Sequence, residues 1–140
     1  FNILQIRPIV AQKEFVSKDL SAIKKEDTLI YSQSALGNGR INDLYDFIYV
    51  KPEFFDASKS LEIAEHINEI NKRLIEEDRY YILVGPGRWG SSDRWLGIPV
   101  KWANISNARL IIESGLENYR IDPSQGTHFF QNLTSFRVGY

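Results

Sequence analysis

The sequence contains no cysteine and no methionine in its 140 residues. Without cysteine the chain can form neither a disulfide nor a cysteine-ligated zinc site, which is compatible with a reducing compartment. No apolar run approaches the ~20 residues that a transmembrane helix needs. The first residues, Phe1–Ile6, lack the basic flank of a signal peptide. We therefore predict a cytoplasmic protein, and we expect a chain that opens inside an apolar run to be a piece of a larger polypeptide.

The chain also lacks an excess of either charge. Lys and Arg number 17 and Asp and Glu number 18, which gives a net charge of -1. A nearly neutral chain has no strong field to attract nucleic acid or an anionic membrane, and neither is predicted as a partner. Hydrophobic residues make up 43% and charged residues 25%, which is typical of a globular domain.

The spacing of apolar residues predicts one long helix and several strands. Residues 57–77 have the three- and four-residue apolar spacing of an amphipathic helix, which Asp56 or Ser58 can cap. Strands are predicted where β-branched and aromatic residues cluster, namely near the start of the chain and at Thr28–Tyr31, Phe47–Val50, Tyr80–Val84, Leu110–Ile112 and Tyr119–Ile121. A short helix is predicted over residues 124–134. The fold class is therefore α/β (or α+β), with a mixed β-sheet covered by one long amphipathic helix and short helices.

The N-terminal segment Gln5-Ile6-Arg7-Pro8 carries two polar side chains that suit a nucleotide. On a strand, residues 5 and 7 project to one face. A guanidinium offers paired donors to phosphate oxygens, and a carboxamide either donates or accepts. The alternative interpretation is an exposed polar edge.

Residues Ile3–Pro8 resemble the closing strand of the ATP-grasp domain in phosphoenolpyruvate synthases and pyruvate phosphate dikinases. In that family the domain ends in a Gln-x-Arg segment, often followed by proline, near the phosphates and metal of ATP. The resemblance implies that Gln5 and Arg7 contact ATP in a parent protein that uses ATP and Mg²⁺. No cofactor is expected for the fragment alone.

The resemblance also suggests how the chain is divided. Residues 1–10 would be the C-terminal strand of the ATP-grasp domain and residues 11–27 a linker. Residues 28–140 would be an α/β accessory domain, truncated at its C-terminal end. Within it, Ser34–Gly39 resembles the glycine-rich entry to the family's next domain. The stretches Gly85–Val100 and Asp122–Phe136 resemble the region after the ATP-grasp part in a subgroup of synthase-like bacterial proteins.

The chain departs from the family at the phosphohistidine. That residue lies in a Thr-Ser-His or Thr-Cys-His segment followed by small residues, whereas the nearest segment here is Gly126-Thr127-His128-Phe129-Phe130. His128 is a candidate phosphoacceptor, since imidazole titrates near neutrality. The favoured alternative is a structural histidine beside two aromatic rings. His66 and His128 are distant in the sequence, and no metal site is predicted.

The loop that follows the predicted strand Tyr80–Val84 is rich in glycine. It begins Gly85-Pro86-Gly87-Arg88-Trp89-Gly90 and continues Ser91-Ser92-Asp93-Arg94. Backbone N–H groups and cationic side chains on such a loop can bind phosphate. The candidate phosphate ligands are Gly85, Gly87, Arg88, Gly90, Ser91, Ser92 and Arg94. The alternative is a rigid structural loop with Trp89 and Trp95 packed inward.

The same segment formally matches the G-x-G-x-x-G pattern of dinucleotide-binding folds, with Glu113 near the place of the ribose-binding acid. Two features count against this fold. Gly97 and Pro99 interrupt the helix that should follow the third glycine, and Pro86 removes an N–H from the loop.

Three hypotheses follow. The chain is an accessory domain of a phosphoenolpyruvate synthase-like phosphotransferase, inactive alone, whose partner is the rest of its own polypeptide. Alternatively, it is an independent module that binds a small phosphorylated ligand at the Gly85–Arg94 loop, or a purely structural interdomain piece.

Overall fold

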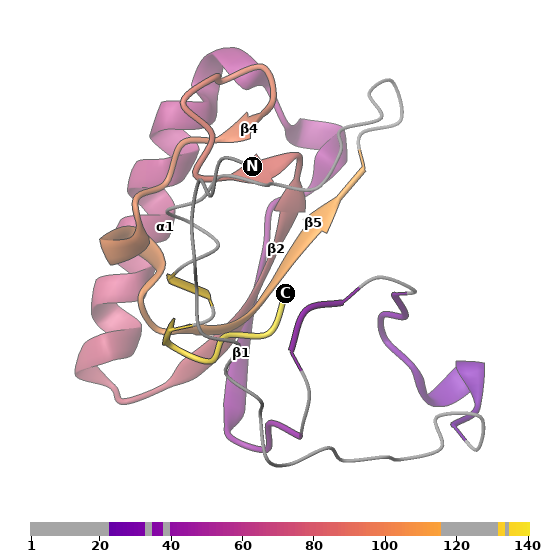
Figure 1. Ribbon diagram of the computed structural model, residues 1–140. Coiled ribbons are helices and arrows are strands. Elements are labelled where there is room, and N and C mark those ends of the chain that lie inside the picture. Colours follow the sequence, from indigo (N-terminus) through magenta and orange to yellow (C-terminus); the bar gives the residue numbers. More distant parts are fainter. Residues whose placement is uncertain (1–22, 33–34, 38–39, 116–131, 134) are drawn as a thin grey trace, which may run out of the picture.

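The computed structural model describes residues 23–32, 35–37, 40–115, 132–133 and 135–140 (Figure 1). The predictions for Gln5, Arg7 and His128 lie outside these residues, as do the predicted strand Tyr119–Ile121 and most of the predicted helix over residues 124–134.

Three parallel strands form the central sheet, in the spatial order β1-β2-β5. They are β1 (Leu44–Tyr49), β2 (Tyr80–Pro86) and β5 (Ala108–Ser114). In the register, Phe47 pairs with Ile82 and Ile82 with Leu110. Three of the strands predicted from the sequence are therefore confirmed, and each is longer than predicted because its polar or glycine-containing ends also join the ladder.

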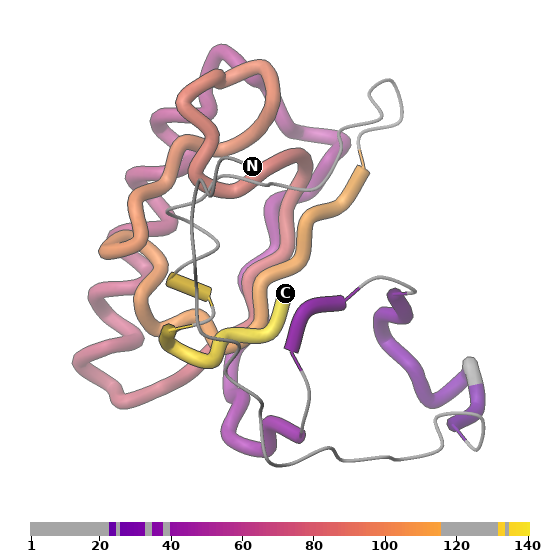
Figure 2. The backbone as a smooth tube through the Cα atoms, viewed as in Figure 1, coloured from indigo at the N-terminus to yellow at the C-terminus, as the bar shows by residue number. Residues whose placement is uncertain are grey.

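The end of the chain extends this sheet beyond β5. Gly139 bridges Leu110 in parallel, and its N–H donates to the carbonyl of Arg109 at 2.9 Å. Tyr140 and Leu36 exchange two backbone hydrogen bonds, of 2.5 and 2.9 Å, which is the pattern of an antiparallel pair. In Figure 2 the C-terminal residues, in yellow, return beside β5. The α/β class is thus confirmed, with parallel named strands and an antiparallel contact at the margin.

One helix connects β1 to β2. α1 (Ser60–Glu76) follows two short 3-10 turns, η3 (Pro52–Phe54) and η4 (Ala57–Lys59). The Asp56 carboxylate accepts the Ser58 hydroxyl at 2.7 Å and the Ser58 N–H at 2.8 Å. The hydroxyl bond and then the N–H bond lower the pKa of Asp56. The predicted cap is therefore present, although it caps the 3-10 turn that leads into the helix.

The connection from β2 to β5 is built of short elements. β3 (Arg88–Trp89) pairs in parallel with β4 (Gly97–Ile98), and η5 (Trp102–Ile105) follows. A further turn, η2 (Lys25–Asp27), lies near the start of the described chain. α1 contacts both β4 and η5, so the helix and this connection cover the same face of the sheet (Figure 1).

The hydrophobic core fills the space between that face and α1. Its fully buried members come from the helix, the strands and the short elements, and they include Ile67, Leu74, Tyr81, Leu83, Trp89, Ile98, Ile105, Ile111 and Leu133. Burying a side chain of this size stabilises the fold by about 1.5–3 kcal/mol. The predicted long amphipathic helix over the sheet is confirmed.

The predicted strand Thr28–Tyr31 is wrong. These residues form no strand, and Leu29 and Tyr31 are 83% and 73% exposed. β-Branched and aromatic residues are stable in a strand only when a neighbouring strand supplies hydrogen bonds and side-chain contacts, and no described strand pairs with this segment.

Candidate functional site

The glycine-rich loop lies where α/β proteins usually bind ligands, at the carboxyl ends of the parallel strands. Its first residues continue β2: Gly85 pairs with Glu113 and Pro86 with Ser114. Gly85, Pro86 and Gly87 are all buried. The structure thus places most of the candidate phosphate residues on one connected segment, and the question is whether its polar groups are available.

Four consecutive backbone N–H groups of this loop are already engaged within the protein. Gly87 N donates to Ser114 O at 3.0 Å, Arg88 N to Leu96 O at 2.9 Å and Gly90 N to Ile98 O at 2.9 Å. Trp89 N donates to the Glu113 carboxylate at 2.9 Å. An anion cradle needs N–H groups that point at the ligand, and these point at carbonyl or carboxylate oxygens of the fold.

The glycines are explained by the close approach of two backbone segments. Gly87 has a φ of +73°, and a Cβ there would lie 2.6 Å from the Leu96 carbonyl oxygen. A Cβ at Gly97 would lie 1.9 Å from the carbonyl oxygen of Arg88. The loop is therefore closely approached by another backbone, as three glycines in six residues suggest. The packing of β3 against β4 therefore explains the glycines of the G-P-G-R-W-G segment.

Trp89 is the anchor of the loop. Its side chain is 1% exposed, and its indole N–H donates to the Ile112 carbonyl at 3.1 Å. A Cβ at Gly85 would lie 2.6 Å from the Trp89 ring, so the ring occupies the space that this glycine leaves. The structural-loop hypothesis also placed Trp95 inside the protein. This part of it is wrong, because Trp95 is 64% exposed.

The second half of the loop is a tight polar turn at the surface. The Ser91 hydroxyl donates to the Asp93 carbonyl at 2.9 Å, and the Asp93 carboxylate accepts the N–H of Trp95 at 2.9 Å. Ser92 and Arg94 are exposed, and Arg88 is half-buried. The part of the loop that solvent reaches therefore offers side chains, rather than an N–H cradle, to a ligand.

The dinucleotide-binding alternative is wrong. Gly90 is followed by a turn and by β4, so the helix that this fold needs directly after its third glycine is missing from residues 91–98. Glu113, the candidate ribose acid, accepts the N–H of Trp89. The physical cause is the break at Gly97 and Pro99, which replaces the required helix with a short strand pairing.

The sequence did not reveal a buried polar network between α1, β2 and η5. Asn71 is fully buried, and its Oδ1 accepts from the Tyr81 hydroxyl at 2.9 Å and from Asn107 N at 3.0 Å. Its Nδ2 donates to Ala103 O and to the Ser106 hydroxyl, both at 3.3 Å. Burial raises the pKa of Tyr81 far above its ordinary value of 10.0. The available signal was one asparagine on the apolar stripe of the predicted helix.

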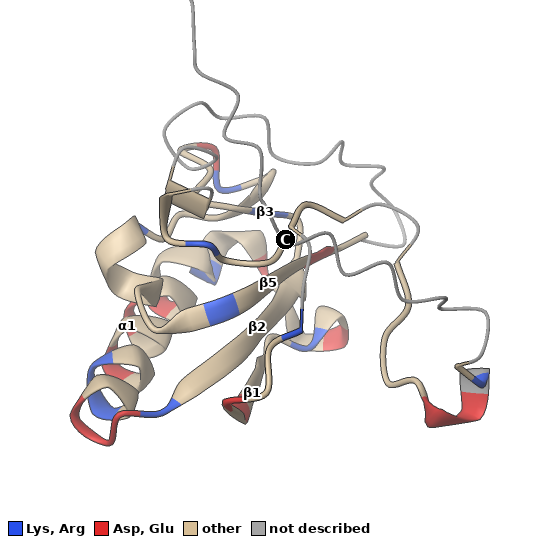
Figure 3. Ribbon diagram, turned by 60° about the horizontal axis from the view of Figure 1, so that its bottom comes forward, with Lys and Arg blue, Asp and Glu red and all other residues tan. Residues whose placement is uncertain are grey.

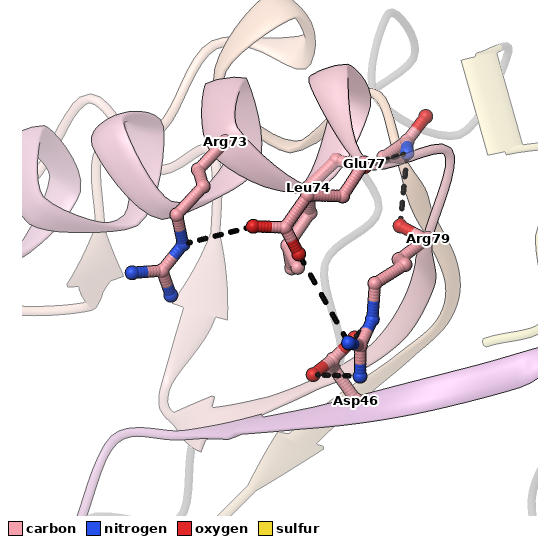
Figure 4. A network of polar contacts seen from close by, with 6 residues as sticks. Asp46, Arg73, Leu74, Glu77 and Arg79 are labelled. Carbon is pink, nitrogen blue, oxygen red and sulfur yellow. Dashed lines mark hydrogen bonds and ion pairs between the residues drawn. The ribbon is translucent and has the colours of Figure 1, made fainter.

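A second polar cluster joins the end of α1 to β1 (Figure 4). Arg79 makes a bidentate contact with Asp46, with Nε–Oδ2 at 2.8 Å and the second pair at 3.1 Å. Glu77 lies between Arg79 and Arg73, at 4.0 and 3.9 Å. All four side chains are partly exposed, which is typical of a structural surface network and not of a catalytic site.

The remaining candidates give no catalytic constellation in the described part of the chain. His66 is exposed on α1. Within the residues that the structure describes, no group of three His, Asp or Glu side chains could hold a metal ion, and no helix is both long and apolar enough to span a membrane. The hydroxyls of Ser60 and Ser114 are buried without a described hydrogen-bond partner.

Comparison with known proteins identifies no relative. No family model matches the chain, and neither the curated proteins nor the solved structures contain a significant match.

Proposed function

We propose that the chain is an accessory domain of an ATP-dependent phosphotransferase similar to phosphoenolpyruvate synthase, and that it does not turn over ATP by itself. The observation that carries the proposal is the engagement of the four N–H groups from Gly87 to Gly90. A loop whose N–H donors already bond to acceptors within the protein stabilises the fold. This favours an accessory role over an independent phosphate-binding module.

The direction in which the sheet is wound supports the same proposal. The strand order β1-β2-β5 follows the chain order, and Gly139 comes next beside β5. Open α/β sheets bind ligands in the crevice where the winding reverses, and the described strands do not reverse. The described strands therefore offer carboxyl ends but no reversal of winding at which such a crevice would form.

In the proposed parent protein, catalysis depends on the rest of the ATP-grasp domain, which is the partner of this chain. By resemblance, Gln5 and Arg7 contact the phosphates of ATP, whose Mg²⁺ the parent also binds. The parent protein is proposed to be cytoplasmic.

The alternative module would use the exposed side chains of Ser92 and Arg94, with half-buried Arg88. Thermal unfolding of the chain with ATP, phosphoenolpyruvate, pyruvate or inorganic phosphate separates the two hypotheses. A ligand present at 100 times its dissociation constant stabilises the fold by ~2.7 kcal/mol, which raises the melting temperature of a domain this size by several degrees. The accessory-domain proposal predicts no shift with any of the four compounds.

Two substitutions in the full-length parent complete the test. Arg7→Ala removes a charge-assisted contact of ~1.5–3 kcal/mol and should lower ATP turnover by about 10- to 150-fold. Arg94→Ala is the matched control, because it removes an exposed arginine of the loop, and it should leave turnover unchanged. Loss of turnover in Arg94→Ala with full turnover in Arg7→Ala would refute the proposal.

A further inference from the structure

The two faces of the sheet are unequally covered. α1 and η5 cover one face, whereas the other carries Phe47, Tyr49, Ile82, Leu110 and Ile112. The described segment Ile23–Ile30 lies near this second face and leaves a shallow hollow of about 340 Å³. Parallel sheets are usually covered on both faces. In Figure 3 β2 is drawn without charged residues, whereas β5 carries a blue and a red band.

Among the described strands, β1 lies at the edge of the sheet, and the hydrogen-bonding groups on its outer edge have no described partner. Val50 N donates to Val84 O on β2 at 2.9 Å. Because successive residues of a strand point to alternate sides, the N–H and C=O groups of Phe47 and Tyr49 point away from β2. No described residue bonds to them. The register shift of β1 lies between Leu44 and Asp46, so the strand is regular from there to its end.

Within β1 itself the lysine and proline that protect many edge strands are absent, although Lys51 and Pro52 follow shortly after the strand. Natural edges carry lysine, proline or an inward-pointing unpaired charge. The only charge in β1 is Asp46, which Arg79 holds in a bidentate ion pair. The three outward residues are aromatic: Tyr45 is 63% exposed, Phe47 43% and Tyr49 46%. An open, apolar edge of this kind is complementary to another strand.

We propose that β1 pairs antiparallel with β1 of a second copy of the chain, about a two-fold axis through Ile48. In this register Phe47 lies opposite Tyr49 of the second copy, and Ile48 lies opposite itself. The free N–H and C=O groups of Phe47 and Tyr49 are then directly opposed, so each pair can exchange both of its hydrogen bonds. Asp46 lies opposite Val50, and no like charges meet.

The area available is sufficient for a weak dimer. An aromatic side chain offers about 150–250 Å², so the exposed parts of the three rings give roughly 300 Å² per copy. Leu29, which is 83% exposed and lines the hollow on the same face, adds to this area. The two copies together therefore exceed roughly 600 Å², within the range below about 1,200 Å² that weak and transient complexes bury. We therefore expect dissociation in the micromolar range.

Sedimentation equilibrium of the 140-residue chain between about 1 and 200 µM is the first measurement. The proposal predicts a reversible monomer–dimer equilibrium that Phe47→Lys shifts to monomer by at least 10-fold, because lysine on an edge opposes pairing. Trp95→Lys is the matched control. It replaces an aromatic residue that lies away from β1 and is more exposed than Phe47, 64% against 43%, and it should leave the equilibrium unchanged.

A single cysteine tests the register. The chain has no cysteine of its own, so in Ile48→Cys any disulfide must join two copies at residue 48. Opposed residues of this kind have Cβ atoms about 4.5–5.5 Å apart, close enough to oxidise readily. Trp95→Cys serves as the control and should form no disulfide-linked dimer under the same oxidation.

Either of two results would overturn the proposal. The first is a chain that stays monomeric up to 200 µM. The second is a dimer that Phe47→Lys leaves intact or that Trp95→Lys also abolishes. Circular dichroism of each variant shows whether it has folded, and the Ile48→Cys cross-link decides the question if Phe47→Lys has not.

Discussion

Replacing Asn71 should destabilise the protein more than any comparable surface change. The side chain is fully buried and serves four groups from three parts of the fold. Asn71→Leu keeps the approximate volume of the side chain, but it leaves the Tyr81 hydroxyl and the N–H of Asn107 without a hydrogen-bond acceptor. A buried donor without a partner costs about 1–3 kcal/mol, so we expect a loss of about 3–5 kcal/mol. That is a large part of the ~5–15 kcal/mol that stabilises a typical domain.

Urea unfolding followed by tryptophan fluorescence measures this loss, and a double-mutant cycle assigns it. Tyr81→Phe alone removes one hydrogen bond and should cost about 1 kcal/mol. In the Asn71→Leu background Tyr81→Phe removes a hydroxyl that has already lost its partner. The substitution should therefore lower the free energy of unfolding by less, or even raise it. We expect a coupling of ~1–2 kcal/mol between the two positions.

The control is Asn68→Ala, on the half-buried side of the same helix, which should change stability by less than ~0.5 kcal/mol. A loss below about 1 kcal/mol in Asn71→Leu, or purely additive effects in the cycle, would refute the reasoning. Such a result would mean that water replaces the missing carboxamide at little cost.

Three further predictions concern single contacts. Because burial raises the pKa of Tyr81, the native state keeps a proton that the unfolded chain loses above pH ~10. Stability should therefore fall as pH rises beyond 10, by up to ~1.4 kcal/mol per pH unit from this group, and urea titrations of Tyr81→Phe should show a smaller fall. Gly97→Ala should cost about 3 kcal/mol in urea unfolding, because its Cβ meets the neighbouring backbone, whereas Gly115→Ala, with nothing within 4 Å, should be neutral. Arg79→Met should cost ~1 kcal/mol at low salt by removing the partly exposed contact with Asp46, and 1 M NaCl should reduce that difference; a salt-independent loss would contradict the ionic explanation.

The secondary structure that local patterns determine could be predicted from the sequence. The helix over residues 60–76 has an apolar stripe, and an aspartate caps the 3-10 turn that leads into it. Strands β2 and β5 are dense in β-branched or aromatic residues. Thr28–Tyr31 has the same composition and forms no strand, because a strand also needs a neighbour, which local sequence does not supply.

The glycine-rich loop shows which property of a site cannot be predicted from local sequence. Three glycines and an arginine after a strand are equally compatible with an anion cradle and with two backbones in contact. The difference lies in where each N–H points, and that depends on acceptors outside the segment itself, namely Leu96, Ile98, Glu113 and Ser114. Only the fold brings these acceptors to the loop.

The order of the strands explains two features: the engaged N–H groups of the glycine-rich loop, and the second face of the sheet, which no described crossover covers. Because β1, β2 and β5 are laid down in chain order, both described crossovers fall on one face. That face gains α1, η5 and the core. The strand ends beneath it are closed by β3 and β4, whose pairing uses the N–H groups of Arg88 and Gly90. The opposite face and the edge of β1 receive no crossover from the described residues. Their apolar side chains and free backbone groups can be satisfied only by another segment or another molecule.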